Sequence, residues 1–195
     1  MDSFELLIQA HRPGMKATLA RLVEILRSHE VRYVIGGANA LSLYVRPRMT
    51  IDIDAFVDPQ RKDELDRVLA ERFQVVSLGR FHSKFKDGDV EIDILYAGAA
   101  AEDFALAHAR DAVILGTKLK AASPEALLWL YLVSENEQNF VDALQLVRSL
   151  PQLDAAAVRA ELEKRDPKAL AKLEKLLSRA RQPASSYEAS RARRS

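Results

Sequence analysis

The stretch VIGGANALSLYVRPRMTIDIDAFV, residues 34–57, decides the fold that we expect for this chain. Its last eight residues alternate polar and apolar side chains, which predicts a strand with Asp52 and Asp54 on one face. Two carboxylates in one small volume repel each other unless protons or cations compensate, and Mg²⁺ prefers carboxylate and phosphate oxygens. The pattern therefore predicts a metal-binding pair. The alternative is an exposed edge strand that carries charge.

The residues before this pair predict a strand, a glycine turn and a short helix. The apolar run 33–35 ends at Gly36 and Gly37, and residues 38–44 can form a helix. Glycines at such a junction let a ligand approach the backbone, and a helix N-terminus offers unpaired N–H groups to a phosphate. Because this turn, an Arg-Pro-Arg segment and Thr50 come in order before the two aspartates, we favour a functional site over a charged edge strand.

This ordered set resembles the signature of the minimal nucleotidyltransferases, the superfamily that includes DNA polymerase beta and kanamycin nucleotidyltransferase. The closest likeness is to the AbiEii-type toxins, over about the first two thirds of the chain. The resemblance implies an α+β fold, with a mixed β-sheet flanked by helices and a third carboxylate on a neighbouring strand. It also implies a nucleoside triphosphate (NTP) substrate, Mg²⁺, a hydroxyl acceptor on RNA such as tRNA, on a protein or on a small molecule, and a cognate antitoxin.

Residues 80–96, RFHSKFKDGDVEIDILY, supply a candidate for the third carboxylate. Two alternating stretches flank Asp87-Gly88, a dipeptide typical of a two-residue type I′ hairpin. With Lys86 opposite Asp89, Lys84 would face Glu91 and His82 would face Asp93. The other face would hold Phe81, Phe85, Val90, Ile92 and Ile94. Asp93 matches the family position better than Glu91, and we interpret Lys84 with Glu91 as an ordinary cross-strand ion pair and His82 as solvated or hydrogen-bonded.

Three further side chains are nucleotide-binding candidates. Arg48 lies beside the aspartate pair, and its guanidinium fits phosphate oxygens bidentately, although it could instead pair with a carboxylate or cap a helix. Thr50 shares the strand face of Asp52 and could support the carboxylates by hydrogen bonds. Lys118 and Lys120 alternate in a predicted strand or hairpin over residues 113–120 and could face a nucleotide or solvent. The predicted site is Asp52, Asp54 and Asp93 as catalytic and metal residues, with Gly36, Gly37, Arg48, Thr50 and Lys118 for the nucleotide.

Two other enzyme classes also use an Asp-x-Asp motif. In haloacid-dehalogenase-like phosphatases the motif ends a buried apolar strand, whereas here the apolar residues follow the pair. Glycosyltransferases would need a nucleotide-binding α/β half upstream, where only about one short strand is available. Neither class fits the order of this sequence.

Composition indicates a soluble, cytoplasmic protein. The chain has 195 residues, with Lys plus Arg (29) nearly balancing Asp plus Glu (28), so no global field indicates nucleic acid or membrane. It lacks cysteine, which excludes disulfides and thiolate chemistry. No run approaches the ~20 apolar residues of a membrane span, and the first residues do not form a signal peptide.

The sequence divides into three parts. We expect a nucleotidyltransferase-like core over residues 1–122, a helical part over 123–181 and a disordered tail over 182–195. In the core we expect helices at 3–10, 14–29 and 60–71 and a strand near 73–78. The helical part begins with Ser123-Pro124-Glu125, which supplies an N-cap, a first-turn proline and an early acid. Two more helices are expected over 154–181, broken at Asp166-Pro167.

The helical part resembles the AbiEii-type pattern but departs from it in charge. Where the family has a lysine and a charged segment, this chain has Tyr131, Asn136, Gln138 and Asn139, and only Asp142 remains of the acidic positions. Either Lys118 or Lys120 substitutes for the lysine, or the protein binds nucleotide poorly. Two functions follow: a Mg²⁺-dependent nucleotidyltransferase, or a non-catalytic member that binds nucleotide, RNA or a protein partner.

Overall fold

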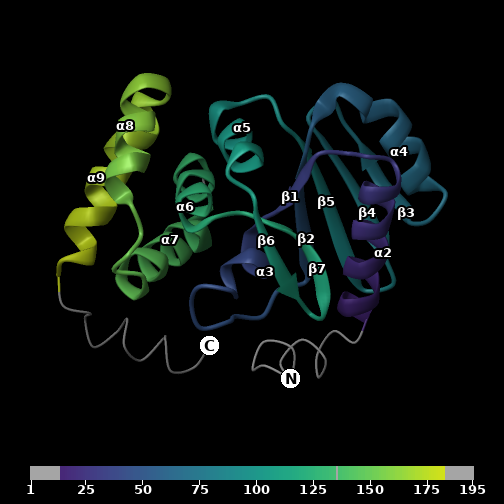
Figure 1. The fold of residues 1–195 in the computed structure, drawn as a ribbon, viewed down its shortest axis with the longest axis horizontal. Coiled ribbons are helices and arrows are strands. Elements are labelled where there is room, and N and C mark those ends of the chain that lie inside the picture. Colours follow the sequence, from purple (N-terminus) through teal and green to yellow (C-terminus); the bar gives the residue numbers. More distant parts are fainter. Residues whose placement is uncertain (1–13, 135, 183–195) are drawn as a thin grey trace.

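The structure is a computed structural model that describes residues 14–134 and 136–182 (Figure 1). The helix expected at 3–10 and the tail expected from 182, apart from Gln182 itself, lie outside the described residues. Within the described ranges, no helix combines the length and the apolar character that crossing a membrane requires.

The described strands form one seven-stranded mixed sheet in the order β3-β4-β5-β2-β1-β7-β6. Their bounds are β1 Tyr33–Ile35, β2 Asp52–Val57, β3 Gln74–Leu78, β4 His82–Asp87, β5 Val90–Tyr96, β6 Arg110–Ile114 and β7 Thr117–Ala121. β2 and β5 pair in parallel at the centre, and β1 pairs antiparallel with β2 and parallel with β7. The expected strand neighbours 50–57 and 89–96 are therefore confirmed as adjacent strands.

Helices cover both faces of this sheet, and a helical part lies beside it (Figure 1). The helices of the core are α2 Gly14–Ser28, α3 Gly37–Leu41, the 3₁₀ turn η1 Pro59–Arg61, α4 Lys62–Ala70 and α5 Ala100–Ala107. The helical part consists of α6 Pro124–Val133, α7 Glu137–Ser149, α8 Ala155–Arg165 and α9 Pro167–Ala180. The α+β architecture with a C-terminal helical part is the one expected, while its division into domains at residue 122 stays a prediction.

The face of the sheet covered by α2 and α4 carries the apolar positions of the alternating strands. Ile53, Ile92 and Phe85 are fully buried there, in the same core cluster as Leu19 and Leu22 of α2. The opposite positions, at Asp52, Asp54 and Asp93, point away from this core because successive side chains of a strand alternate faces. One face of these strands therefore packs in the core, and the other face carries the residues of the candidate site.

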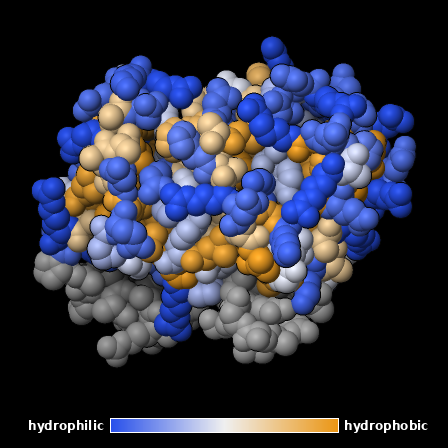
Figure 2. Space-filling model, in the orientation of Figure 1, coloured by the Kyte–Doolittle hydropathy of each residue, from blue (hydrophilic) through white to orange (hydrophobic). Residues whose placement is uncertain are grey.

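Helix α6 is the centre of the helical part. Its residues 126–132 are all buried, and it contacts α3, α5, α7, α8 and α9, which is the environment that a helix with no polar face requires. The Ser123 hydroxyl accepts a hydrogen bond from the Ala126 N–H at 3.2 Å, and Pro124 occupies the first turn, as the sequence predicts. Figure 2 shows mostly hydrophilic side chains on the outer face of the molecule, interrupted by apolar patches near its middle.

The β4–β5 hairpin differs from the prediction by two residues. Asp87 pairs with Val90, so the loop is Gly88-Asp89 and the backbone register places Lys84 opposite Asp93. The predicted ion pair of Lys84 with Glu91 is nevertheless present, at 3.0 Å. Only Gly88 has a positive φ, which matches a type II′ turn instead of type I′. The carboxylate of Asp87 accepts hydrogen bonds from Thr18 and Arg21, each at 2.5 Å, and these contacts with α2 hold it in the strand.

One further correction concerns the same region. Phe81 precedes β4 and is 62% exposed, so it is not part of the buried face on which we placed it. Of the strand or hairpin expected over residues 113–120, the structure shows the β6–β7 hairpin, whose loop residues Leu115 and Gly116 both have positive φ. The pairing register of the β4–β5 hairpin differs from the predicted one by two residues, and a shift by two keeps every side chain on the same face of the sheet. The face that carries Asp93 is therefore the predicted one.

Candidate active site

Three carboxylates meet at the centre of the sheet. Asp54 on β2 is paired with Asp93 on β5 in the parallel ladder, and Asp52 lies two residues before Asp54 on the same face. One ligand oxygen from each of the three lies within 4.8 Å of the others. The sequence prediction that Asp93 joins the aspartate pair is confirmed in its geometry, while the catalytic role of the three residues stays a prediction.

The carboxylates are crowded enough to perturb one another. Burial, followed by the neighbouring charges of Asp52 and Asp93, raises the pKa of Asp54 to about 7. Arg48 and Lys84 lower it, but they do not compensate. A bound divalent cation would relieve the repulsion that this pKa reports, since hard cations prefer such oxygen ligands. The donor set therefore fits Mg²⁺.

Asp52 and Asp93 have different side-chain partners. The Thr50 hydroxyl donates to Asp52 Oδ1, and the Asn39 amide donates to the Asp52 carbonyl at 2.8 Å. His82 Nε2 lies 2.5 Å and Lys84 Nζ lies 3.5 Å from Asp93 Oδ1. Thr50 thus has the supporting role predicted for it, and His82 reaches Asp93 although the backbone register places it opposite Leu95.

The glycine turn contacts the carboxylates directly. Gly37 has a φ of +54°, and a Cβ added to it would overlap the Asp54 carboxylate. A Cβ on Gly36 would lie 2.6 Å from the Phe56 ring. Both glycines are therefore required by close packing around the carboxylates, a reason independent of any bound phosphate.

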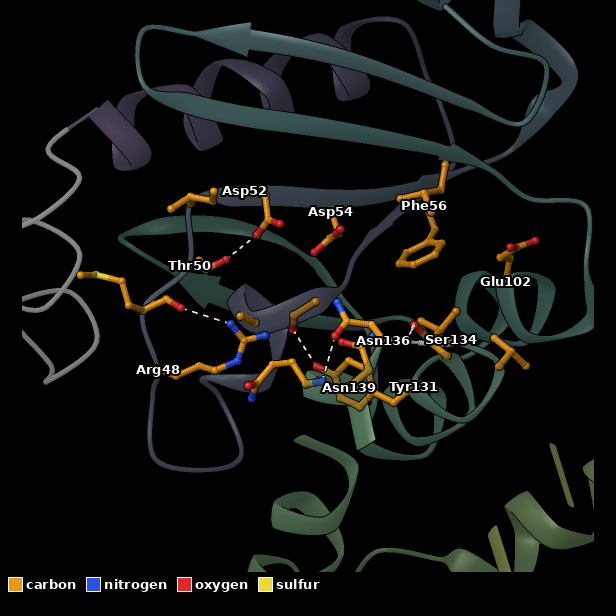
Figure 3. A pocket seen from close by; sticks show the side chains of 18 residues that line it. Arg48, Thr50, Asp52, Asp54, Phe56, Glu102, Tyr131, Ser134, Asn136 and Asn139 are labelled. Carbon is orange, nitrogen blue, oxygen red and sulfur yellow. Dashed lines mark hydrogen bonds between the residues drawn. The ribbon is translucent and has the colours of Figure 1, made fainter. Parts of the chain in front are cut away.

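Asp52 and Asp54 line a cavity of about 550 Å³ between the sheet and the helical part (Figure 3). Asp54 points into the middle of this space, with Arg48 and Thr50 toward one end and Phe56 and Glu102 toward the other. The wall on the side of the helical part carries Tyr131, Ser134, Asn136, Gln138 and Asn139. Several of these are the amide and tyrosine positions where the family pattern has charged residues.

Arg48 lines this cavity but already has a carboxylate partner. Its Nε and NH2 donate to both oxygens of Asp142 on α7 at 2.8–3.1 Å, and Asp142 is fully buried. Burial lowers the pKa of Arg48, but the hydrogen bond and charge of Asp142 outweigh it and the pKa is raised. Of the three roles left open for Arg48, namely phosphate binding, carboxylate pairing and helix capping, the structure shows carboxylate pairing.

Lys118 is not among the side chains that line the cavity. It lies on β7, exposed, and its carbonyl accepts a hydrogen bond from Arg27 of α2 at 2.6 Å. Lys120 is also exposed and pairs with Asp111 at 3.0 Å. The structure therefore does not support the prediction that Lys118 contacts the nucleotide. Lys84 is a lysine that approaches the carboxylates, with its Nζ 3.5 Å from Asp93 Oδ1. The sequence feature that indicated this position is the alternation of His82, Lys84 and Lys86 on the strand next to Asp93.

Comparison with solved structures shows the nucleotidyltransferase fold. The antibiotic-resistance factor ANT(2″)-Ia in complex with adenylyl-2″-tobramycin has a TM-score of 0.59 at 20% identity, over 76% of this chain and 97% of that one. The solution structure of the same factor has a TM-score of 0.57 at 21% identity, with coverages of 82% and 97%. The lincomycin-bound lincosamide adenylyltransferase LnuA has a TM-score of 0.51 at 16% identity, with coverages of 67% and 95%.

Comparison of the sequence alone gives no match. No protein-family model matches it, and no curated protein does. An AbiEii-type relationship is not shown. What the comparisons establish is a chain with the nucleotidyltransferase fold.

Proposed function

We propose that this protein is a nucleotidyltransferase that moves a nucleotide from an NTP onto a hydroxyl acceptor in a Mg²⁺-dependent reaction. The observation that carries the proposal is the carboxylate trio, drawn from two neighbouring parallel strands, of which Asp52 and Asp54 line the cavity. The fold shared with nucleotidyltransferases supports it.

The residues of the trio divide the chemistry between them. Asp52, Asp54 and Asp93 would hold Mg²⁺, which when bound neutralises triphosphate charge and lowers the pKa of the acceptor hydroxyl. The acceptor oxygen attacks the α-phosphorus, the bond to the bridging oxygen breaks, and pyrophosphate leaves. Asp93 accepts the hydroxyl proton, and His82 and Lys84 keep its carboxylate oriented.

The acceptor does not follow from the fold. ANT(2″)-Ia and LnuA act on antibiotics, but at 16–21% identity the likeness extends to architecture alone. The acceptor proposed here stays a hydroxyl of RNA, a protein or a small molecule. A role as the toxin of a toxin–antitoxin pair and a cytoplasmic location rest on the sequence resemblance and composition.

A transfer assay tests the proposal. Purified full-length protein would be incubated with each labelled NTP, Mg²⁺ and one of four acceptor sets: tRNA, total protein, tobramycin or lincomycin. We expect incorporation into one set, and a loss of orders of magnitude in Asp54→Asn and Asp93→Asn. Transfer that persists in folded Asp54→Asn would contradict the site.

The second candidate function is a non-catalytic member of the same fold. Two observations favour it: the cavity wall has a tyrosine and amides where the AbiEii-type pattern has a lysine and a charged segment, and Arg48 is already paired with Asp142. NTP binding without transfer to any acceptor would select this candidate.

A further inference from the structure

The helical part contacts the two aspartates of β2 by two separate routes. We propose that Asp142 on α7 and Tyr131 on α6 are positioning residues that set the geometry of the metal-binding carboxylates. Asp142 acts on Asp52 through Arg48 and Thr50, and Tyr131 acts on Asp54 through Gly37. The inference rests on the proposed function, because it concerns how that site binds its cation.

The first route starts at a buried carboxylate. Asp142 accepts the paired bonds from Arg48 and a third bond from Gln138 Nε2 at 2.8 Å. Arg48 in turn donates to the Met49 carbonyl at 3.1 Å, one residue before Thr50. Residues 45–50 form neither helix nor strand, so this anchor determines where the Thr50 hydroxyl meets Asp52 Oδ1.

Loss of the anchor would also release a charge. Arg48 lies within electrostatic range of Asp52, since the Asp52 charge contributes to its raised pKa. A guanidinium without Asp142 would pair with the nearest free carboxylate, and Asp52 would then be engaged by Arg48 in competition with a cation. Both consequences weaken cation binding at the trio, although Asp142 does not belong to it.

The second route passes through the glycine turn. The Tyr131 hydroxyl donates to the Gly37 carbonyl at 3.1 Å, and burial raises the pKa of Tyr131, so that it stays protonated. Gly37 packs so closely on Asp54 that a methyl group does not fit between them. Movement of this turn therefore moves the surface against which the Asp54 carboxylate rests.

The test measures binding of Mn²⁺ alone, by electron paramagnetic resonance of the purified full-length chain. Neighbours that orient metal ligands typically contribute about 10–100-fold to affinity. We expect Asp142→Asn to weaken Mn²⁺ binding by about tenfold or more, and Tyr131→Phe to weaken it in the same direction. Both substitutions preserve shape and remove one charge or one hydroxyl.

Asp66→Asn is the matched control. Asp66 is also a buried carboxylate with three partners, Lys62, Ser83 and Tyr96, but it lies on the other face of the sheet. It should lower the melting temperature and leave Mn²⁺ affinity at the wild-type value. An equal loss of affinity in Asp66→Asn would overturn the inference, because general destabilisation would then explain the result.

A double-mutant cycle tests the path itself. If the first route passes through Thr50, Asp142→Asn should cost less affinity in a Thr50→Val background than in the wild type. Unchanged Mn²⁺ affinity in both Asp142→Asn and Tyr131→Phe would overturn the positioning role. If Asp142→Asn does not fold, Arg48→Lys replaces it, since lysine cannot make the paired bonds. No Mn²⁺ binding by the wild type would overturn the metal site of the proposed function, an outcome distinct from equal binding by all variants.

Discussion

Replacing Asp54 by Asn should stabilise the metal-free protein at pH 8, although Asp54 belongs to the candidate site. Its pKa is raised from 3.8 to about 7, chiefly by burial and then by Asp52 and Asp93. In the folded state Asp54 therefore keeps a proton that the unfolded chain releases near pH 4. Between these values the folded state binds more protons, so this group makes stability fall as pH rises, until it is fully ionised above pH 7.

The shift sets the size of the effect. About three pKa units at about 1.4 kcal/mol each correspond to roughly 4 kcal/mol. Water in the open cavity screens the charges, so we expect a gain of about 1–3 kcal/mol for Asp54→Asn at pH 8. For a chain of this size that is about 2–4 °C in melting temperature per kcal/mol. The gain should shrink as pH falls to 5, where nearly all of the wild-type Asp54 in the folded state is already protonated.

Urea unfolding in a metal chelator, followed by the fluorescence of the single buried tryptophan, Trp129, measures this difference. Added Mg²⁺ should then stabilise the wild type at pH 8 by mass action and leave Asp54→Asn unaffected. Asp66→Asn, which removes a carboxylate bonded to Lys62, should be less stable than the wild type at pH 8. An Asp54→Asn variant no more stable than the wild type at pH 8 would refute the charge-crowding argument.

Two further predictions use positions that the structure distinguishes. Gly37→Ala should lose the Mg²⁺-dependent rise in melting temperature because its Cβ overlaps the Asp54 carboxylate. Gly88→Ala has a similar positive φ of +60° but open space around it, so it should show backbone strain of about 1 kcal/mol and keep the rise. If the two variants responded to Mg²⁺ in the same way, the steric argument would fail. Lys118→Ala should keep the NTP-dependent rise in melting temperature that we expect for the wild type, since Lys118 does not line the cavity; a rise present in the wild type and lost in the variant would show that Lys118 contacts the nucleotide after all.

Local patterns predicted the parts of the site that lie within single strands. Alternation in residues 50–57 and 89–96 assigns Asp52, Asp54 and Asp93 to the strand faces opposite their apolar neighbours, because side-chain period is a property of the strand alone. That the two strands are neighbours is not contained in either pattern, and the family resemblance supplied that step. Their parallel direction was not predicted and comes from the structure.

Interactions between distant segments account for the errors. The hairpin register depended on Asp87, which favours a turn locally but is bonded to Thr18 and Arg21 of α2. The partner of Arg48 lies 94 residues away on α7, and no local feature of the Arg-Pro-Arg segment indicates which carboxylate it will meet. In both cases a side chain with two plausible local roles is assigned by a tertiary contact.

The net charge of the cavity lining bears on how a nucleotide could bind without the lysine of the AbiEii-type pattern. Its lining has three acidic residues, Asp52, Asp54 and Glu102, against the single base Arg48, whose charge is already matched by Asp142. A triphosphate entering this space meets net negative charge, and the described lining offers no free cationic side chain to oppose it. The AbiEii-type pattern that the sequence resembles has a lysine that would supply one. Under the proposed function, the attraction for a nucleotide would therefore come from a metal ion at the trio, and the geometry of Asp52 and Asp54, with the contacts from α6 and α7, would govern nucleotide binding as well as chemistry.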